Sequence, residues 1–443
     1  MTDTSIGLVP RPLELDSQPP LAADSGSRAK AARRAGEDTN ATDAIALEIH
    51  ADLAKVAPLW QAFQVDASHT FFQTYAWLEA WQRHVGIRTA TAPVIVTGKH
   101  ADGTLLFVLP LAIQRRAAVR ELRFLGSDLC DYNAPLLHPG FSEMVGEGDF
   151  AALWRRIVAL LRADGRFGFD VIDLAKMPEH VGKQRNPLLA LHTEPNPSGA
   201  YLTTLTGAWD EFYARKRSSS TRKKERQQLR QLGEFGEIHF VDALEGEDRA
   251  KTLDLLFEQK AKSFARMGVR NIFVRPGYRE LFTSFAMDPK ARSLVHLSRL
   301  EVGSSVVAIS IGFTAVSCYY LVLSSYEGGD IARFGPGRVH LQELLRHAIR
   351  NDFACFDFTI GDELYKQDWS DARLTLYDHL SAATYRGTIA VALINRFRVI
   401  KRAIKQNPQM WQLFSRARSY LGAINSRRQG AGKPARDGGD HHA

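Results

Sequence analysis

The sequence predicts a mixed α/β (α+β) fold built as two related halves, each with a mixed, largely antiparallel sheet flanked by helices. A length of 443 residues suits two domains with tails better than one domain. Runs rich in β-branched and aromatic residues alternate with stretches of helical periodicity. A strand hairpin, a loop, an amphipathic helix and a strand containing Phe-Asp occur in this order twice, which favours duplication of one unit.

The composition is that of a folded chain with a basic surface. Hydrophobic residues make up 45% of the sequence and charged residues 24%, so a sizeable core can be buried. The formal net charge of +8 favours anionic partners such as nucleotide phosphates, nucleic acid or anionic lipid. It does not choose among them.

The cysteines are few and far apart. Cys130, Cys318 and Cys355 form no C-x-x-C pair, so the sequence predicts neither a disulfide framework nor a zinc or other metal site. Cys318 and Cys355 lie in apolar runs and are expected to pack in the core rather than act as nucleophiles. Such usage is typical of a reducing compartment, and the first residues lack a secretory signal pattern. We therefore expect a cytoplasmic protein.

The two ends of the sequence lack the pattern of a folded segment. Residues 1–42 are rich in Pro, Ala, Ser, Asp and Arg, and residues 426–443 in Gly, Arg and Asp. Neither stretch can bury enough apolar surface to fold alone. Both are expected to be disordered.

The N-terminal half is predicted over residues 43–200. Asp102-Gly103 between two apolar runs is typical of a hairpin turn. The expected elements are helices at 51–63 and 75–84, strands at 92–97, 104–115 and 121–125, a loop at 131–133, a helix at 149–163 and a strand at 169–174.

The C-terminal half, with the linker before it, is predicted over residues 201–388. No charged residue lies between Glu301 and Glu327, but serines and β-branched residues there favour buried strands over a membrane helix. The expected elements are a helical region at 259–267, strands at 293–301, 306–314 and 318–324, a helix at 338–350 and a strand at 355–358. His340 and His347 on that helix are expected to be solvated or capping groups.

A basic helix is predicted to join the halves over about residues 208–232. Its cations surround the helix, and no aromatic residues are interleaved, so it encodes a nucleic-acid surface poorly. We expect a solvated helix near an anionic substrate. The basic residues are Arg215, Lys216, Arg217, Arg222, Lys223, Lys224, Arg226 and Arg230.

Basic helices are also predicted over residues 389–425. They combine cations with apolar side chains, which allows peripheral contact with the inner face of a membrane or with a partner enzyme, although packing against the domain is the commoner arrangement. The apolar side chains are Phe397, Ile400, Ile404, Trp411, Phe414 and Tyr420.

A glycine loop before the helix at 338–350 is the most informative segment. Glycines let the backbone approach a ligand, and the amides that open a helix attract a diphosphate. It is neither a Walker motif nor G-x-G-x-x-G, and a tight turn without a ligand is the alternative. The candidate cofactor-binding residues are Arg333, Phe334, Gly335, Pro336, Gly337 and Arg338.

A second candidate cluster follows the last predicted strand, where a strand end opens towards a cleft. Asp362 or Glu363 could accept a proton from an attacking amine or hydroxyl, and Tyr365 could return one to a departing thiolate. Lys366 could bind a phosphate or an acidic group. The alternative is a salt-bridged turn of Asp357, Asp362 and Lys366 that only shapes the loop.

These motifs resemble the signature of the CelD-type acetyltransferases. The similarity lies in Gly335 to Arg338 with its helix, Phe356-Asp357-Phe358, the run from Gly361 to Lys366, and Trp369, and it extends over about residues 71–385. That family is a GNAT branch associated with cellulose and exopolysaccharide biosynthesis, and it is similar in plan to the tandem-GNAT FemAB proteins. The resemblance implies two GNAT-like halves, with the loop holding the pyrophosphate of CoA.

The resemblance also implies an activity. We expect transfer of an acyl group, with acetyl as the first candidate, from acyl-CoA to a hydroxyl or amine of a saccharide or glycolipid precursor. We expect no metal ion to take part. Direct attack on the thioester needs no enzyme nucleophile. The first half has Asp131, Tyr132 and Asn133 in place of the glycine loop. It is therefore expected to have lost cofactor binding and to help hold the acceptor.

Two alternatives remain open at this point. A FemAB-like transferase would take its acyl group from charged tRNA and use the basic linker helix to contact it. A non-catalytic accessory protein of polysaccharide synthesis would keep the fold and use its basic C-terminal surface for a membrane or a synthase.

Overall fold

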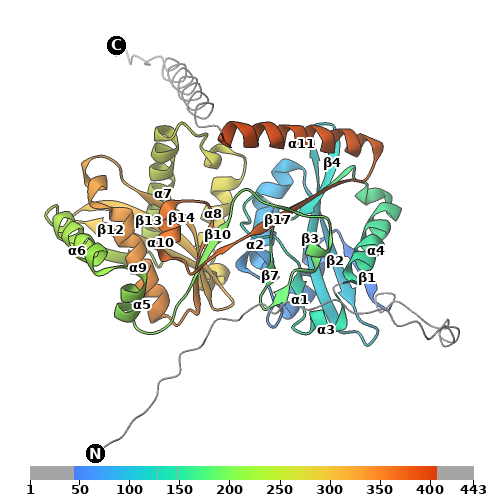
Figure 1. The fold of residues 1–443 in the computed structure, drawn as a ribbon, viewed down its shortest axis with the longest axis horizontal. Coiled ribbons are helices and arrows are strands. Elements are labelled where there is room, and N and C mark those ends of the chain that lie inside the picture. Colours follow the sequence, from blue (N-terminus) through green and yellow to red (C-terminus); the bar gives the residue numbers. More distant parts are fainter. Residues whose placement is uncertain (1–43, 127, 147, 407–443) are drawn as a thin grey trace, which may run out of the picture. The chain divides into compact units, whose positions relative to one another are not determined.

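The computed structural model describes residues 44–126, 128–146 and 148–406, with side chains up to Arg396. Two sheets organise these residues (Figure 1). The N-terminal sheet runs β1-β2-β3-β4-β6-β17-β9, and β5 pairs with β3. Its strands are β1 Ala46–His50, β2 Ala92–Lys99, β3 Leu105–Arg116, β4 Val119–Phe124, β5 Leu136–Leu137, β6 Val171–Pro178, β9 Glu194–Pro195 and β17 Leu376–Ala382.

The C-terminal sheet has seven strands in the order β11-β12-β13-β14-β15-β10-β16. Its strands are β10 Ala200–Thr204, β11 Ile238–Asp242, β12 Val295–Val302, β13 Ser305–Ala315, β14 Cys318–Tyr326, β15 Cys355–Ile360 and β16 Ala372–Leu374. A separate short hairpin, β7 His180–Val181 with β8 Gln184–Arg185, belongs to the N-terminal half.

The two sheets share one plan, which confirms the predicted pair of related halves. In each, four antiparallel strands are followed by a strand parallel to the fourth, β6 beside β4 and β15 beside β14. The repeated Phe-Asp pair is a poor guide to this equivalence. Asp170 precedes β6, whereas Asp357 lies within β15, and it is Asp173 that occupies the third position of the parallel ladder as Asp357 does.

The halves exchange strands, and of the two exchanged strands only β17 departs from the predicted domain boundaries at 43–200 and 201–388. β10 follows the N-terminal half in the chain but pairs with β15 of the C-terminal sheet. β17 comes after the C-terminal half but pairs with β6 of the N-terminal sheet. Both connections run through the middle of the molecule in Figure 1.

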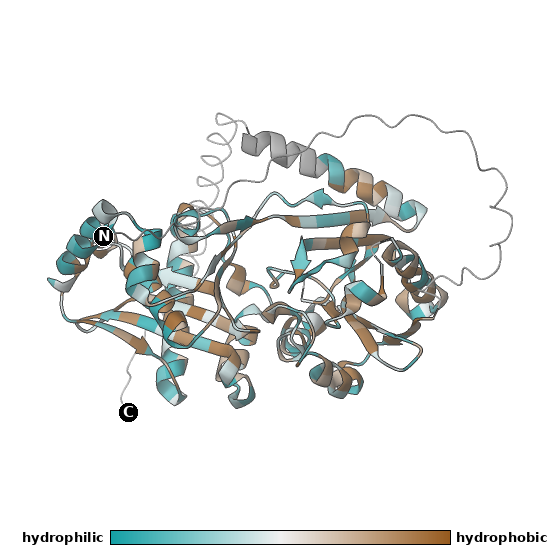
Figure 2. Ribbon diagram, turned by 60° about the horizontal axis from the view of Figure 1, so that its bottom comes forward, coloured by the Kyte–Doolittle hydropathy of each residue, from teal (hydrophilic) through white to brown (hydrophobic). Residues whose placement is uncertain are grey.

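Helices cover both faces of each sheet, and their apolar sides face the strands (Figure 2). Helix α4 covers one face of the N-terminal sheet because Leu153, Ile157 and Leu161 recur at helical spacing and are buried. In the C-terminal half α9 covers one face, and α7 and α8 the other. The helices are α1 Leu53–Phe63, α2 Tyr75–Trp81, α3 Phe141–Met144, α4 Phe150–Ala163, α5 Trp209–Lys216, α6 Ser219–Gly233, α7 Gly246–Arg266, α8 Tyr278–Met287, α9 Pro336–Arg350, α10 Leu364–Trp369 and α11 Tyr385–Gln406.

The linker is two helices, α5 and α6, so the prediction of one helix over residues 208–232 was wrong. Ser218 lies between them and its hydroxyl accepts a hydrogen bond from the amide of Thr221, which caps the start of α6. Serine favours such a cap over a helix interior because its side chain competes for backbone groups. Helix α7 in turn begins at Gly246, well before the predicted 259–267.

Helix α11 packs along β17, β6 and β4, which answers part of the prediction for residues 389–425. A side chain at Gly387 would bring its Cβ within 1.8 Å of the carbonyl oxygen of Asp170, so only glycine allows this close approach. The predicted apolar side chains from Phe397 onwards lie outside the side chains that the structure describes, as do residues 1–42 and 426–443.

The uncharged stretch between Glu301 and Glu327 forms β13 and β14, as predicted. Among the described residues, no helix is long and apolar enough to span a bilayer.

The expectation about the cysteines was wrong in one respect. Cys318 and Cys355 form a disulfide although 37 residues separate them, because the parallel ladder of β14 and β15 places them opposite each other. Disulfides persist in oxidising environments. The cysteine usage therefore no longer supports a reducing compartment.

An aromatic core joins the two halves. Phe71 stacks on Phe313 with ring centroids 4.2 Å apart, and Trp77 lies 5.1 Å from Phe313 and 5.3 Å from Phe285. Phe71 and Trp77 come from the N-terminal half, and the two phenylalanines they contact come from β13 and α8. The halves therefore bury one continuous apolar cluster.

We predict that Phe313→Ala lowers the free energy of unfolding by about 3–5 kcal/mol, because it leaves a cavity where both halves pack. Urea unfolding followed by fluorescence and circular dichroism measures it. The exposed counterpart Tyr385→Ala, at a residue that is 81% exposed, should change stability little. Two separate transitions in the wild-type protein would contradict a core shared by both halves.

Candidate functional site

A groove begins where β14 and β15 part. Their parallel ladder holds three residue pairs, from Cys318 with Cys355 to Tyr320 with Asp357. The hydroxyl of Thr359 still reaches the carbonyl oxygen of Leu321 at 3.3 Å. Beyond this point β14 continues to Tyr326, whereas the chain after β15 turns into α10. Among the described residues, no strand pairs with this edge of β14 beyond Tyr320.

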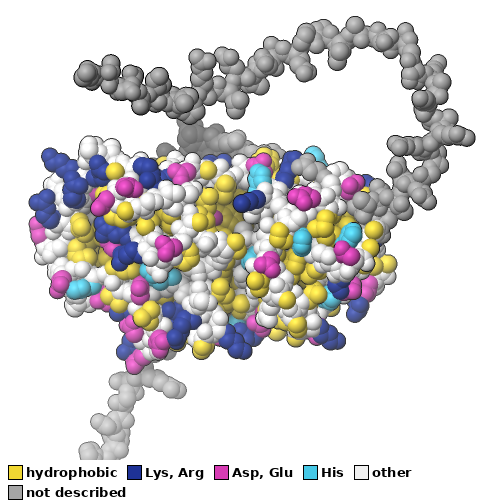
Figure 3. Space-filling view, turned by 90° about the horizontal axis from the view of Figure 1, so that it is seen from below, with side chains coloured by type: hydrophobic (Ala, Val, Ile, Leu, Met, Phe, Trp, Pro, Cys, Tyr) yellow, Lys and Arg dark blue, Asp and Glu magenta, His cyan; other side chains and the backbone are white. Residues whose placement is uncertain are grey.

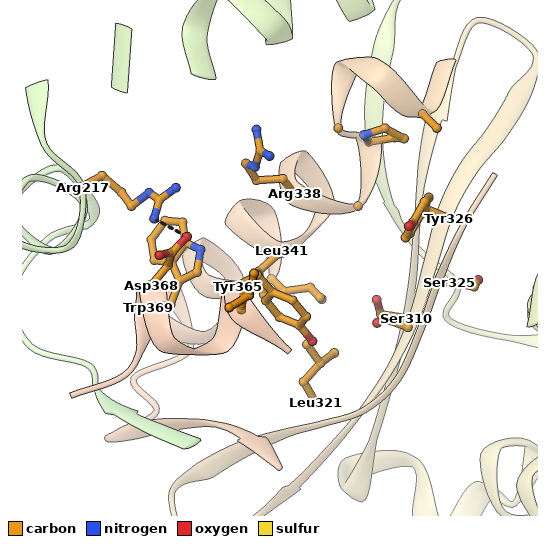
Figure 4. A pocket seen from close by; sticks show the side chains of 17 residues that line it. Arg217, Ser310, Leu321, Ser325, Tyr326, Arg338, Leu341, Tyr365, Asp368 and Trp369 are labelled. Carbon is orange, nitrogen blue, oxygen red and sulfur yellow. Dashed lines mark ion pairs between the residues drawn. The ribbon is translucent and has the colours of Figure 1, made fainter. Parts of the chain in front are cut away.

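The groove has a volume of about 490 Å³ and runs between β14, the start of α9 and α10 (Figure 4). Figure 4 shows the ring of Tyr365 between Leu341 and Leu321, near its middle. Its lining residues are Arg217, Ser310, Leu321, Ser324, Ser325, Tyr326, Ala332, Gly335, Pro336, Gly337, Arg338, Leu341, Leu344, Leu364, Tyr365, Asp368 and Trp369.

The start of α9 presents backbone to the groove. Gly335 precedes the helix with φ 68°, a conformation that favours glycine, and Pro336 occupies the first helical position. The amides of Arg338 and Val339 donate to the carbonyl oxygen of Gly335. Proline has no N–H, so the amide of Gly337 is the first-turn donor that has no protein acceptor among the described residues.

A side chain at position 337 would crowd the opposite wall of the groove. A Cβ there would lie 3.1 Å from the ring carbon Cδ1 of Tyr326 across the groove. The free amide and the open approach fit a phosphate group at the positive end of this helix. Tyr326 and its neighbours Ser324 and Ser325 are site residues that the sequence analysis missed.

The glycine-loop prediction divides into two parts. Gly335, Pro336, Gly337 and Arg338 line the groove. Arg333 and Phe334 do not, because the guanidinium of Arg333 lies over the ring of Phe334, 4.8 Å from its centroid, and that ring packs against Phe235.

Cations gather beside the groove, on the end of the molecule that carries α5 and α6 (Figure 3). Arg217 lines the groove but is engaged by Glu225 at 2.8 Å and Asp368 at 3.1 Å, and it lies over the ring of Trp369. Arg338 donates to the side-chain oxygen of Gln228 on α6. The linker helices therefore hold the basic side chains of the groove in place.

Of the four predicted catalytic residues, Tyr365 lines the groove and the other three do not. Glu363 pairs with Lys366 at 3.1 Å. Lys366 is buried and donates to the carbonyl oxygen of Ile360 at 2.8 Å. Asp362 lies 3.7 Å from Arg373 and borders a different surface hollow. The structure thus separates one groove residue from three that shape the turn after β15.

Burial raises the pKa of Tyr365, and the charge of Glu363 raises it further. The phenol therefore keeps its proton at neutral pH. A protonated hydroxyl inside the groove can donate a hydrogen bond or a proton.

The equivalent gap in the N-terminal half is filled by its own loop. The amide of Asn133 donates to the carbonyl oxygen of Lys176 on β6 at 3.0 Å, and its side-chain amide donates to Ala175. The ammonium of Lys176 reaches back to the carbonyl oxygen of Cys130 at 2.9 Å. No groove can open between β4 and β6 while these bonds persist.

The same loop contacts the other half through Tyr132, which is another link that the sequence analysis missed. The hydroxyl of Tyr132 donates to Oδ1 of Asp357 at 2.7 Å, and the amide of Thr359 donates to the same oxygen at 2.7 Å. Asp357 is buried at the point where β15 leaves β14. Its hydrogen-bond partner is thus Tyr132, not Asp362 or Lys366 as in the alternative of a salt-bridged turn.

Burial raises the pKa of Asp357 to about 7. The hydrogen bonds from Tyr132 and Thr359 and the charge of Lys366 lower it, and the nearby carboxyl of Asp131 raises it. Burial also raises the pKa of Asp131, and that of Tyr132. The junction between the halves therefore carries a carboxyl group that titrates near neutral pH.

Comparisons with known proteins identify part of this arrangement. The family described as Acetyltransferase (GNAT) domain matches residues 219–367, about a third of the chain, which contain the groove. This match supports a transferase. No curated protein matches the sequence.

Solved structures resemble the whole fold at low identity. FemX superposes with a TM-score of 0.51 and 12% identity, covering 75% of this chain and 95% of that chain. A protein of unknown function from Bacteroides thetaiotaomicron gives 0.47 and 11%, covering 76% and 100%. A tandem GNAT protein from the clavulanic acid pathway gives 0.44 and 12%, covering 76% and 99%. The FemX likeness shows the fold alone, which is the predicted plan of two GNAT-like halves.

We predict that Asp357→Asn flattens the pH dependence of stability. The pKa of Asp357 lies above that of an unfolded aspartate, so the stability from its protonated form is complete below about pH 4 and is lost as pH rises through about 7. Between these limits the wild type should lose on the order of 2–4 kcal/mol more than the variant, measured by urea unfolding. Asparagine keeps the oxygen that accepts both hydrogen bonds.

Tyr132→Phe provides the matched variant. It removes a donor that lowers the pKa of Asp357, so the loss of stability should move to higher pH. Identical pH profiles for the wild type and Asp357→Asn would contradict this account.

Proposed function

We propose that this protein transfers an acyl group, with acetyl as the first candidate, from acyl-CoA to an acceptor that attacks the thioester directly. The observation that carries the proposal is one continuous groove that extends from the free amide of Gly337 to the hydroxyl-bearing ring of Tyr365. The GNAT domain match over residues 219–367 supports the same reaction class.

The donor is expected to bind along the groove in one direction. Gly337 and Arg338 would hold the pyrophosphate, because a helix N-terminus and a guanidinium both favour phosphate oxygens. The unpaired edge of β14 offers backbone donors and acceptors to the amides of the pantetheine arm. The thioester would then lie near Leu321 and Tyr365, where β14 and β15 part.

Tyr365 is our candidate acid for the departing thiolate, because it lines the groove and its raised pKa keeps it protonated. Glu363 is kept as a candidate base from the sequence analysis, although its carboxylate pairs with Lys366 and does not line the groove. Asp362 and Lys366 are assigned to the shape of the turn. Direct attack on the thioester needs no metal ion in this proposal.

The acceptor is proposed on the resemblance to CelD-type proteins, which points to a hydroxyl or amine of a saccharide or glycolipid precursor of an exopolysaccharide. The N-terminal half, with its gap filled by the loop at 130–133, would hold it. Exposed Tyr385, Ile389 and Leu393 on α11 could contact a membrane or a polysaccharide synthase. Such contacts would place the protein at the inner face of the membrane.

A second candidate function is supported by the fold of FemX and by the basic residues of α5 and α6. In this case charged tRNA would replace acyl-CoA as the donor. Calorimetric titration with acetyl-CoA and with aminoacyl-tRNA separates the two. Binding of tRNA without binding of acetyl-CoA would overturn the main proposal. Unchanged polymer acetylation in a strain carrying Gly337→Asp would favour the accessory role.

We predict that Gly337→Asp weakens acetyl-CoA binding at least roughly 100-fold, about 2.8 kcal/mol. The carboxylate repels phosphate, and the added Cβ meets the ring of Tyr326. Calorimetry measures the affinity, and circular dichroism checks the fold. Gly165→Asp is the control, because a side chain at Gly165 has no atom within 4 Å. Wild-type affinity in Gly337→Asp would exclude this cradle.

We predict that Tyr365→Phe lowers kcat by about 100-fold and leaves acetyl-CoA affinity nearly unchanged, because it removes a proton donor and keeps the ring. Release of free CoA thiol is measured with acetyl-CoA and a panel of amino sugars and oligosaccharides. Tyr326→Phe removes a hydroxyl from the opposite wall of the groove and should keep its activity. A normal kcat in Tyr365→Phe would remove this residue from the mechanism.

A further inference from the structure

Three potential metal ligands meet at the far end of α9. Asp242 ends β11, His296 lies on β12 and His347 lies in the last turn of α9. One ligand atom from each lies within 4.8 Å of the others. His340 is buried against Ser298, so the expectation of a solvated or capping group was wrong for it. His347 is half-buried, and its ring stacks on that of His296.

The cluster is already oriented by hydrogen bonds. Nε2 of His296 lies 2.9 Å from a carboxylate oxygen of Asp242, and Nδ1 lies 2.8 Å from the hydroxyl of buried Tyr319. Metal-binding histidines usually have their second nitrogen engaged in this way, which fixes the ring. The tyrosine therefore leaves Nε2 directed at the carboxylate and at any ion bound there.

We propose that Asp242, His296 and His347 bind one divalent transition-metal ion of the Zn²⁺ class. Two imidazoles and one carboxylate are a donor set for Zn²⁺, Co²⁺ or Ni²⁺, whereas Ca²⁺ and Mg²⁺ take oxygen ligands. The negative end of the α9 dipole also favours a cation beside its last turn. This inference is independent of acyl transfer.

Binding requires a small rearrangement that can itself be observed. The rings of His296 and His347 are stacked, 3.8 Å apart with an interplanar angle of 12°. Three ligands around one zinc ion lie about 2.0–2.2 Å from it. The ligand atoms must therefore draw together, and the ring of His347 must turn out of the stack so that its nitrogen points at the ion.

A surface cavity lies beside one of the three ligands, and an opposing charge acts on the other two. His296 borders a surface cavity of about 250 Å³. The hydrogen bond with His296 lowers the pKa of Asp242, burial lowers the pKa of His347, and the charge of Arg350 lowers both further. Arg350 therefore acts on both ligands and would repel a cation. Arg350 also lies 3.7 Å from Glu343.

The ion would act as a clamp rather than in catalysis. About 11 residues of α9 separate Pro336 from His347, which is roughly 16 Å along the helix axis. A metal at this distance does not contact groups in the groove. It would link the helix that opens the groove to the edge strand β11 and its neighbour β12.

The test uses the full chain with His441→Ala and His442→Ala as background, because those two adjacent histidines could bind metal themselves. After treatment with a chelator, the protein is titrated with Zn²⁺ by calorimetry and with Co²⁺ by visible absorption. We expect one Zn²⁺ per chain with a Kd of micromolar or below, and a tetrahedral or five-coordinate Co²⁺ spectrum. Absence of binding by this parent overturns the proposal.

His347→Ala and Asp242→Asn should each weaken Zn²⁺ binding at least tenfold and abolish the rise in Tm that Zn²⁺ causes in the parent. Arg350→Ala should tighten binding. His239→Ala is the matched control, since His239 also lies on β11 beside an acid, Glu237 at 3.4 Å, but belongs to no such cluster. Unchanged affinity in either ligand variant that folds places the ion elsewhere and overturns the assignment.

Discussion

The parting of β14 from β15 is the constraint on which the groove depends. After three ladder pairs, the first of them joined by the disulfide, β15 diverges from β14 and ends at Ile360, and α10 takes the place of a partner strand. Backbone groups along β14 then face a space bordered by the start of α9. Had β15 paired with β14 as far as Tyr326, the hydrogen bonds between the two strands would have used the backbone groups of β14. No groove would then lie between the glycine turn and Tyr365.

The N-terminal half carries the same strands and loses the groove through local hydrogen bonding. Hydrogen bonds of Asn133 and Lys176 fill the gap beside β6 with the loop at 130–133. In the C-terminal half the equivalent position holds the glycine turn that begins α9. The loop at 130–133 then supplies Tyr132 to Asp357 at the junction. The N-terminal half thus uses, to contact the C-terminal half, the loop at the position where the C-terminal half is expected to bind its ligand. The exchanged strands β10 and β17 join the two halves further.

Much of the fold could be predicted because its elements have local signals. Helix α4 and the strands of the uncharged stretch follow from periodicity, and the Gly-Pro-Gly turn marks the start of α9. The missed features join residues distant in sequence. The Cys318–Cys355 bridge, the bond from Tyr132 to Asp357 and the exchange of β10 and β17 depend on register between strands, which periodicity does not encode. The burial of Lys366 could not be foreseen either, because no sequence pattern reveals that its ammonium donates to the carbonyl oxygens of Thr359 and Ile360.

Hydrogen exchange of the backbone amides, with and without acetyl-CoA, tests the central claim most directly. The account predicts slower exchange in residues 321–326 and 335–341, where the edge of β14 and the start of α9 would bind the donor, and no change in residues 119–126 and 128–137, where the equivalent gap is filled. Protection confined to the N-terminal half, or none in residues 335–341 at saturating acetyl-CoA, would contradict it.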